Sequence, residues 1–235
     1  MKISIAVPQS AISNIKTKAM RIAVVIPSRG RPNQLGRAID SIGDAAKVYV
    51  GLEGGDPQPH PVAPVLLFPD DTPTTFKWNA LADYAVSHGA DIVILGADDI
   101  LFETRGWDEM LRERFVCFSD RILAVGFNDG RSHGAVPHYA VSKEWIAALG
   151  YFCPPIFHHW CVDTWTESVG HRIGRFQYAH DIMVRHDTVK LTGVIDETHA
   201  RIRRGVWHER DKSLFRMSEH YREADAAILR RLTRA

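Results

Sequence analysis

This 235-residue sequence contains few cysteines, no long apolar run and almost no net charge. The three cysteines, Cys117, Cys153 and Cys161, are too few for a disulfide framework and are typical of a reducing compartment. No run of about 18 apolar residues is present, so the sequence predicts no membrane-spanning helix. The N-terminal residues also lack the pattern of a signal peptide. We therefore expect a cytoplasmic protein.

The formal charge of +1 is low for a protein that binds a polyanion over its whole surface, but the charge is unevenly distributed. Residues 201–235 contain ten Lys and Arg residues against five Asp and Glu residues. The pattern predicts a basic, amphipathic helix over Asp211–Leu232, which a polyanionic partner could contact. We expect the 201–235 segment to pack on or near a main domain of residues 21–200, which an extension of residues 1–20 precedes.

Apolar runs alternate with amphipathic segments in the first half of the sequence. The segments between the runs predict helices, capped by Asn33 and by Thr74 or Thr75, with a third helix from about Gly106. This alternation is typical of a doubly wound α/β fold with a mostly parallel central sheet. The second half reads as an elaboration of the same domain. The predicted strands cover Arg21–Pro27, Lys47–Leu52, Val65–Phe68, Asp91–Leu95, Ile122–Gly126 and Ile182–His186.

Two adjacent carboxylates, Asp98 and Asp99, follow the predicted strand Asp91–Leu95. Divalent cations such as Mg²⁺ prefer oxygen ligands and are commonly held by one or two carboxylates together with substrate phosphates. Ligands of doubly wound sheets bind beyond the carboxyl ends of the strands, and the loop Ser28–Arg31 lies at the same edge. Acids at a strand end can also simply cap the next helix, so the pair alone leaves both interpretations open.

Three short motifs, in this order, resemble the family 2 glycosyltransferases with the GT-A fold. Residues 24–32 (VVIPSRGRP) resemble the opening strand and loop of that family, and Lys77-x-Asn79 resembles its basic element near the nucleotide. Gly96-Ala97-Asp98-Asp99 falls where the family carries its Asp-x-Asp metal motif. The resemblance covers about residues 21–190. In one departure, Gly96 stands where the first acid of the metal motif is expected.

The resemblance implies a metal-dependent, inverting, non-processive glycosyltransferase that uses a nucleotide diphosphate sugar, with a UDP-sugar as the expected donor. Asp98 and Asp99 would hold Mn²⁺ or Mg²⁺, with His186 as a third ligand and His180 as the alternative to it. The residues expected to bind the donor are Pro27, Ser28, Arg29, Arg31, Lys77, Asn79 and Asp98.

On the acceptor side, Asp163 falls where inverting members of the family place the base that takes the proton of the acceptor hydroxyl. Glu167 and Asp181 are alternatives, and Asp163 can equally be an acid favoured by a helix N-terminus. Small soluble proteins of similar appearance occur in bacteriophages, where some glycosylate hydroxymethylated pyrimidines in DNA. The resemblance therefore makes DNA a candidate acceptor and a host cytoplasm a candidate location. Aromatic residues between Tyr151 and Trp165 could form a stacking wall or a local core.

Other interpretations stay open. A nucleotidyltransferase could use a similar sheet, although the loop Ser28–Arg31 contains only one glycine. The missing acid at Gly96 is compatible with a protein that binds nucleotide sugars without catalysis. A zinc site could involve Cys153, His158, His159 and Cys161, although their spacing fits no zinc framework.

Overall fold

The computed structural model describes residues 20–57, 65–130, 136–187, 193, 195–204 and 206–233. The extension expected over residues 1–20 therefore lies outside the described residues, apart from Met20. Within the described part of the chain, no helix is long and apolar enough to cross a membrane.

Eight strands of the described residues form one sheet, in the order β3-β2-β1-β4-β7-β6-β8-β5. β5 and β7 run against their neighbours, and the other six strands share one direction. The expected mostly parallel, doubly wound sheet is confirmed. The strands are β1 (Ile22–Ser28), β2 (Lys47–Glu53), β3 (Leu66–Phe68), β4 (Ile92–Leu95), β5 (Ile100–Phe102), β6 (Ala124–Asn128), β7 (Tyr139–Ser142) and β8 (Phe176–His186).

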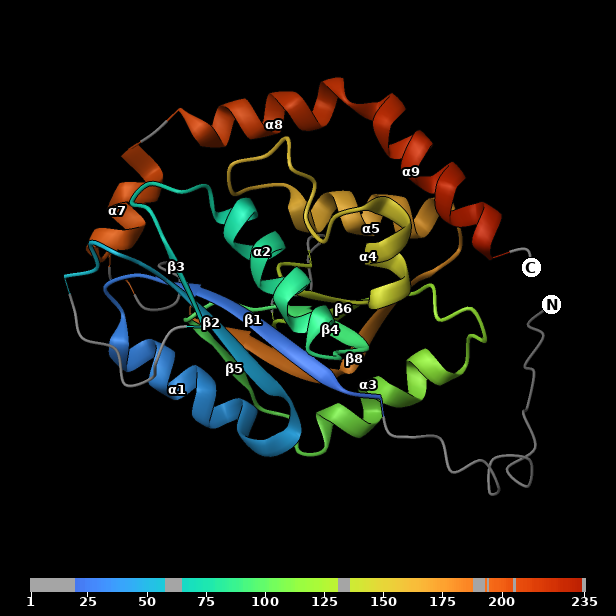
Figure 1. The fold of residues 1–235 in the computed structure, drawn as a ribbon, viewed down its shortest axis with the longest axis horizontal. Helices are drawn as coiled ribbons and strands as arrows, with labels where there is room; N and C mark the ends of the chain where they lie inside the picture. Colours follow the sequence, from blue (N-terminus) through green and yellow to red (C-terminus); the bar gives the residue numbers. More distant parts are fainter. Residues whose placement is uncertain are drawn as a thin grey trace.

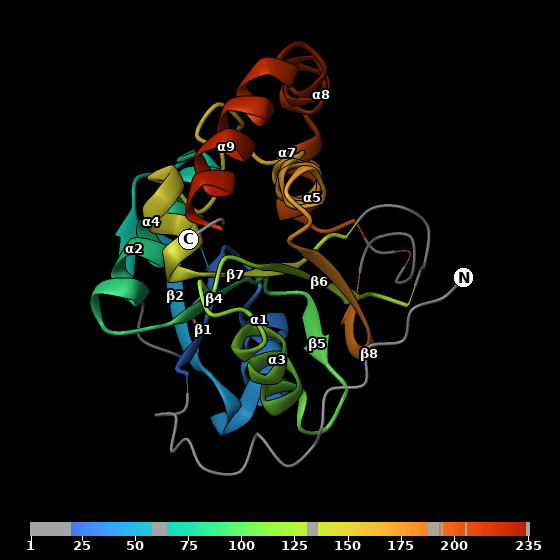
Figure 2. The same cartoon turned by 90° about the vertical axis from the view of Figure 1, so that its right-hand side faces the viewer.

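Helices cover both faces of this sheet, so β1 and β4 are apolar along almost their whole length (Figure 1). Figure 2 shows α1 and α3 on one face, α2, α4 and α5 on the other, and α8 and α9 as an outer layer beyond α4 and α5. The described helices are α1 (Pro32–Ile42), the 3₁₀ turn η2 (Gly43–Ala45), α2 (Thr74–Ser87), α3 (Trp107–Val116), α4 (Lys143–Leu149), α5 (Val162–Arg172), α7 (Glu197–Arg204), α8 (Trp207–Met217) and α9 (Glu219–Leu232).

The C-terminal helices contribute to the core of the domain. Ala226 and Leu229 of α9 are fully buried and belong to the same apolar cluster as Leu81 of α2 and Trp165 of α5. The single helix expected over Asp211–Leu232 is wrong, because the chain breaks at Ser218 into α8 and α9. At the break, the carbonyl of Leu214 accepts both the backbone N–H and the hydroxyl of Ser218.

Two predicted helix caps are also wrong. Helix α1 begins at Pro32, with Arg31 rather than Asn33 in the capping position. Proline is favoured at the first helical position, because its missing N–H would have no partner there. Helix α2 begins at Thr74 after Pro73, and neither helix has a side-chain cap.

Candidate functional site

The carboxyl ends of β1, β2 and β4 lie side by side, because these three strands are adjacent and parallel. Here Ser28, Glu53 and Leu95, the last residues of these strands, face one cleft of about 670 Å³. The predicted site residues that line this cleft are Pro27, Ser28, Arg29, Arg31, Lys77, Asp98, Asp99, Asp163 and His186.

Asp98 and Asp99 are both buried at one side of the cleft. The Ser28 hydroxyl donates to Asp98 Oδ2 at 2.7 Å. The Arg31 guanidinium donates to Asp98 Oδ1 at 2.9 Å and to Asp99 Oδ2 at 3.4 Å. Its other edge pairs with Asp196, at 2.7 Å from Nε and 2.9 Å from Nη2. One guanidinium therefore lies among three carboxylates, which leaves this part of the cleft negatively charged.

Strand β5 brings a histidine to the acidic pair. Ile100 directly follows Asp99 and pairs with His186 of β8, so that His186 Nε2 lies 3.2 Å from Asp99 Oδ1. Burial raises the pKa of Asp98 to about 6, in spite of the charge of Arg31. Burial acts in the same direction on Asp99, but the hydrogen bond with His186 and the nearby positive charges lower its pKa to about 2. The two neighbouring acids therefore ionise in different pH ranges.

Glu53, at the end of β2, gathers three cations in another part of the cleft. Its carboxylate accepts from Lys77 Nζ, from Arg29 at 2.6 Å and from Arg201 at 2.8 Å. Burial opposes the ionisation of Glu53, but hydrogen bonds from Arg201, Lys77 and Arg29 outweigh it and lower the pKa of Glu53 to about 2. Burial also lowers the pKa of Lys77. Three cations therefore converge on one buried carboxylate, and their only other carboxylate contacts among the described residues are with the exposed Asp70 and Asp71.

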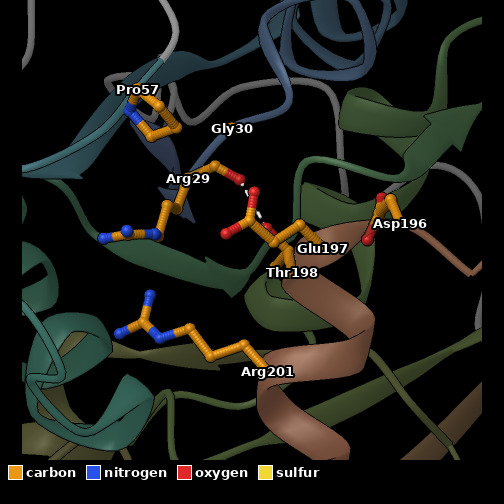
Figure 3. Close-up of a pocket in the computed structure, with 7 residues that line it drawn as sticks. All are labelled: Arg29, Gly30, Pro57, Asp196, Glu197, Thr198 and Arg201. Atoms are coloured by element: carbon orange, nitrogen blue, oxygen red, sulfur yellow. Dashed lines mark hydrogen bonds between the residues drawn. The ribbon is translucent and has the colours of Figure 1, made fainter.

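Helix α7 closes one side of this cationic cluster (Figure 3). The Thr198 hydroxyl donates to the carbonyl oxygen of Arg29 at 2.7 Å. In Figure 3, the side chains of Arg29 and Arg201 extend to the same side, away from Asp196. Arg201 also contacts Asp71 at 2.7 Å, but the Asp71 side chain is 85% exposed, so water weakens that pair.

Helix α5 presents Asp163 in its first turn. One carboxylate oxygen accepts from the backbone N–H of Thr164 at 2.8 Å, and burial raises the pKa of Asp163. A raised pKa makes a carboxylate a better proton acceptor. The alternatives Glu167 and Asp181 are not among the described residues that line the cleft; Asp181 is exposed and pairs with Arg114.

The aromatic loop before α5 is held by α8. Asp211 is fully buried, and its carboxylate accepts the backbone N–H groups of His158, His159 and Trp160 at 2.9 to 3.1 Å. The ring of His158 stacks on Trp207 at a centroid distance of 4.5 Å. Of the expected stacking wall, His159 and Trp160 line the cleft, whereas Phe152, Phe157 and Trp165 are core residues.

No protein-family model and no curated protein matches the sequence. Among solved structures, TarS of S. aureus is similar with a TM-score of 0.51 and 9% sequence identity, over 70% of this chain and 36% of TarS. Glucosyl-3-phosphoglycerate synthase from Mycobacterium tuberculosis, in complex with Mg²⁺ and UDP, gives a TM-score of 0.49 and 14% identity, over 76% of this chain and 81% of that chain. Drosophila β1,4-galactosyltransferase 7, with xylobiose, gives 0.49 and 12%, over 78% and 79%.

The chain has the GT-A fold. It spans about a third of the length of TarS, and at these identities the likeness concerns the fold. The glycine at position 96 packs closely against β1. A Cβ atom there would lie 2.7 Å from Val24 Cγ1 and 2.9 Å from the carbonyl oxygen of Val25. Such distances require β1 to shift, so the close contact between β1 and the end of β4 disfavours any side chain at this position.

Asn79 is the one predicted GT-A donor residue that does not line the cleft in the described structure. Its amide nitrogen donates to the carbonyl of Cys153 at 2.8 Å. Its amide oxygen accepts the backbone N–H groups of Phe152 and Cys153 at 2.9 and 2.7 Å. Asn79 therefore fastens the aromatic loop to α2, and both ends of its amide are used in that contact.

Several residues of the cleft were not predicted. Glu53 carried a readable signal, because it ends an apolar strand that pairs in parallel with the strand ending at Ser28. Nothing local in the sequence marks the others, since their partners lie far away along the chain. These residues are His138 and Arg201, which line the cleft, and Asp196 and Asp211, which hold Arg31 and the aromatic loop beside the cleft. Burial, together with the neighbouring His186, lowers the pKa of His138 to about 3.

Proposed function

We propose that this chain is a glycosyltransferase that moves a sugar from a nucleotide diphosphate sugar, most simply a UDP-sugar, to an acceptor hydroxyl. One observation carries the proposal: a single cleft of a GT-A fold places a cationic cluster around Glu53 beside the buried acids Asp98 and Asp99. A diphosphate needs positive charge, and the cation that accompanies it needs carboxylate oxygens.

The cations of the cluster would bind the diphosphate of the donor. Arginine and lysine side chains donate charge-assisted hydrogen bonds to phosphate oxygens, and Arg29, Lys77 and Arg201 already converge on one carboxylate. Pro27 and Ser28, at the end of β1, would border the nucleoside. Arg31 would stay with the acids that it contacts.

Asp98 and Asp99 suit a divalent cation such as Mn²⁺ or Mg²⁺. Together with Asp196, they place three carboxylates around the one guanidinium of Arg31, so negative charge remains for such a cation to balance. Among the described residues, no three candidate ligands converge on one point. The two acids would therefore hold the cation with phosphate oxygens of the donor, and His186, beside Asp99, is the candidate nitrogen ligand. When bound, the cation would offset charge on the departing diphosphate.

Asp163 would act as the base. Its half-buried carboxylate lines the same cleft, and its raised pKa favours proton uptake from the acceptor hydroxyl. The oxygen left behind would attack the sugar carbon on the face opposite to the diphosphate, and the sugar would be transferred with inversion.

A hydroxymethylated pyrimidine in DNA is the acceptor that we propose to assay first. The stacked rings of His158 and Trp207 at the cleft suit a flat base. Part of the basic charge of the C-terminal segment is paired within the molecule, since Arg201 contacts Glu53 and Arg222 contacts Glu219. We therefore expect DNA to bind through a local contact at the cleft rather than along the whole segment.

A thermal-shift screen of nucleotide diphosphate sugars, with and without Mn²⁺, tests the donor. Ligands that bind the folded state raise the melting temperature, so we expect UDP-sugars to do so, and more strongly with Mn²⁺. Product analysis then tests the reaction. Release of nucleoside diphosphate supports sugar transfer, whereas release of pyrophosphate would identify a nucleotidyltransferase. If the donor binds but is neither transferred nor slowly hydrolysed, the chain is a binding protein.

The variant Asp163→Asn tests the base. We expect transfer to fall by roughly 10² to 10⁴, with the dissociation constant of the donor nearly unchanged. Glu167→Gln, one turn further along α5, is the matched control and should keep its activity. If Asp163→Asn loses donor binding and transfer equally, Asp163 is not the base.

A further inference from the structure

His138 is one of the residues that line the cleft, and it is only 4% exposed. Nδ1 lies 3.1 Å from the carbonyl oxygen of Leu95. Nε2 is buried and has no hydrogen-bond partner among the residues that the structure describes. The same cleft contains a second nitrogen of this kind, Nδ1 of His159.

The contact with Leu95 fixes which nitrogen of His138 carries hydrogen. A carbonyl oxygen can only accept, so Nδ1 donates, and Nε2 of the neutral ring is left with a lone pair. A lone pair requires a donor, such as a hydroxyl or an amide N–H. Phosphate oxygens only accept, so the diphosphate of a nucleotide sugar cannot satisfy this nitrogen.

The cleft therefore presents hydrogen-bond donors in one part and a hydrogen-bond acceptor in another. The cluster of Arg29, Lys77 and Arg201 presents donors, which suit phosphate. His138 presents an acceptor, which suits a sugar hydroxyl. A buried polar group that stays unpaired is unfavourable, and a ligand that supplies the missing hydrogen gains affinity from that contact.

The ring of His186 lies beside that of His138. The two rings pack at a centroid distance of 4.8 Å and an angle of 69°. His186 Nε2 also lies 3.2 Å from Asp99 Oδ1, so the pocket around His138 borders the acids of the cleft.

We propose that His138 is a specificity residue that accepts a hydrogen bond from a hydroxyl of the transferred sugar. The inference rests on the proposed function and names the contact that selects the sugar. It makes His138 a contact of the sugar and not of the nucleotide.

Isothermal titration with UDP and with UDP-glucose, UDP-galactose and UDP-N-acetylglucosamine tests this contact. We expect His138→Phe to keep the dissociation constant of UDP and to raise that of the preferred UDP-sugar about tenfold. His138→Gln places an amide oxygen near the position of Nε2 and should recover part of the affinity. His220→Phe, at an exposed position of α9, is the control for the loss of a histidine.

Deoxy analogues of the preferred UDP-sugar identify the hydroxyl. One of them should lose affinity with the wild type and lose none with His138→Phe, because the contact is already absent there. The inference is overturned if His138→Phe weakens UDP as much as the UDP-sugar, or if no deoxy analogue couples to the variant. A wild type that binds neither UDP nor any UDP-sugar would instead overturn the proposed function, and the role of His138 with it.

Discussion

Asp211 is fully buried and accepts the backbone N–H of His158, 53 residues earlier in the chain, at 3.0 Å. The same carboxylate holds His159 and Trp160, so α8 fixes the loop that carries one wall of the cleft. The basic C-terminal segment is therefore a structural support of the site, in addition to any contact that it makes with an acceptor.

The first prediction concerns this anchor. Asp211→Asn turns an amide group toward backbone donors and removes a charged acceptor, so we expect the free energy of unfolding in urea to fall by about 2 to 3 kcal/mol. Glu209→Gln, whose side chain is 75% exposed on the same helix, should change stability little. Similar losses in both variants would show that the loop does not depend on Asp211.

The second prediction concerns Glu53. Glu53→Gln leaves Arg29, Lys77 and Arg201 without their common carboxylate, so at pH 7 we expect a loss of about 1 to 3 kcal/mol of stability together with tighter binding of UDP at low salt. Asp71→Asn, at the exposed rim, is the control. Weaker binding of UDP by Glu53→Gln would place the diphosphate elsewhere.

The same variant has a pH signature. The pKa of Glu53 is lowered to about 2 in the folded protein, from an unfolded value of 4.5. A carboxylate with a lowered pKa stabilises the fold above its unfolded pKa and loses that contribution as the pH falls through the folded value. The stability difference between wild type and Glu53→Gln should therefore shrink between about pH 4.5 and 2.

The third prediction concerns Asp98, whose pKa burial raises to about 6. Cation binding requires the ionised carboxylate, so the Mn²⁺-dependent affinity for UDP-glucose should fall about tenfold per pH unit below that value. UDP-glucose is the suitable probe because its diphosphate is esterified at both ends and does not titrate in this range. For the apo protein the sign is opposite: this acid alone makes the fold more stable as the pH falls from 6 toward 4. An affinity that is constant between pH 7 and 5 would remove Asp98 from the cation site.

The fourth prediction concerns Gly96. The added methyl group of Gly96→Ala would press on Val24, Ile26 and the backbone of β1, and we expect a loss of about 1 to 3 kcal/mol in stability. Gly54→Ala is the control, because the nearest atom to its added Cβ would be 3.9 Å away. A Gly96→Ala protein as stable as the control would mean that β1 yields easily to a side chain at this position.

The sequence predicts the site residues that lie at the carboxyl ends of the parallel strands, because the order of the strands determines their positions. Ser28 ends β1 and Asp98 follows β4, and apolar runs of that kind place their carboxyl ends at one edge of a parallel sheet. The contact of Asp99 with His186 depends on β5, whose three residues are too few to show a period.

The contacts of the C-terminal segment escape prediction for a different reason. Arg201 and Glu53 are 148 residues apart, and neither residue type specifies its partner. Asp211 reads in the sequence as one charge among many on a basic helix, and only the packing of α8 shows that it is buried.

The pairing of Arg31 with Asp196, across 165 residues, has a consequence for biosynthesis. A ribosome that has released only the first 190 residues has already delivered Asp98, Asp99 and Arg31, but not the carboxylate that holds the outer edge of the guanidinium. The loop 158–160 likewise lacks the carboxylate that holds it until Asp211 has been synthesised. The strands are therefore all synthesised before the cleft can be complete, because its last supports come from the C-terminal helices.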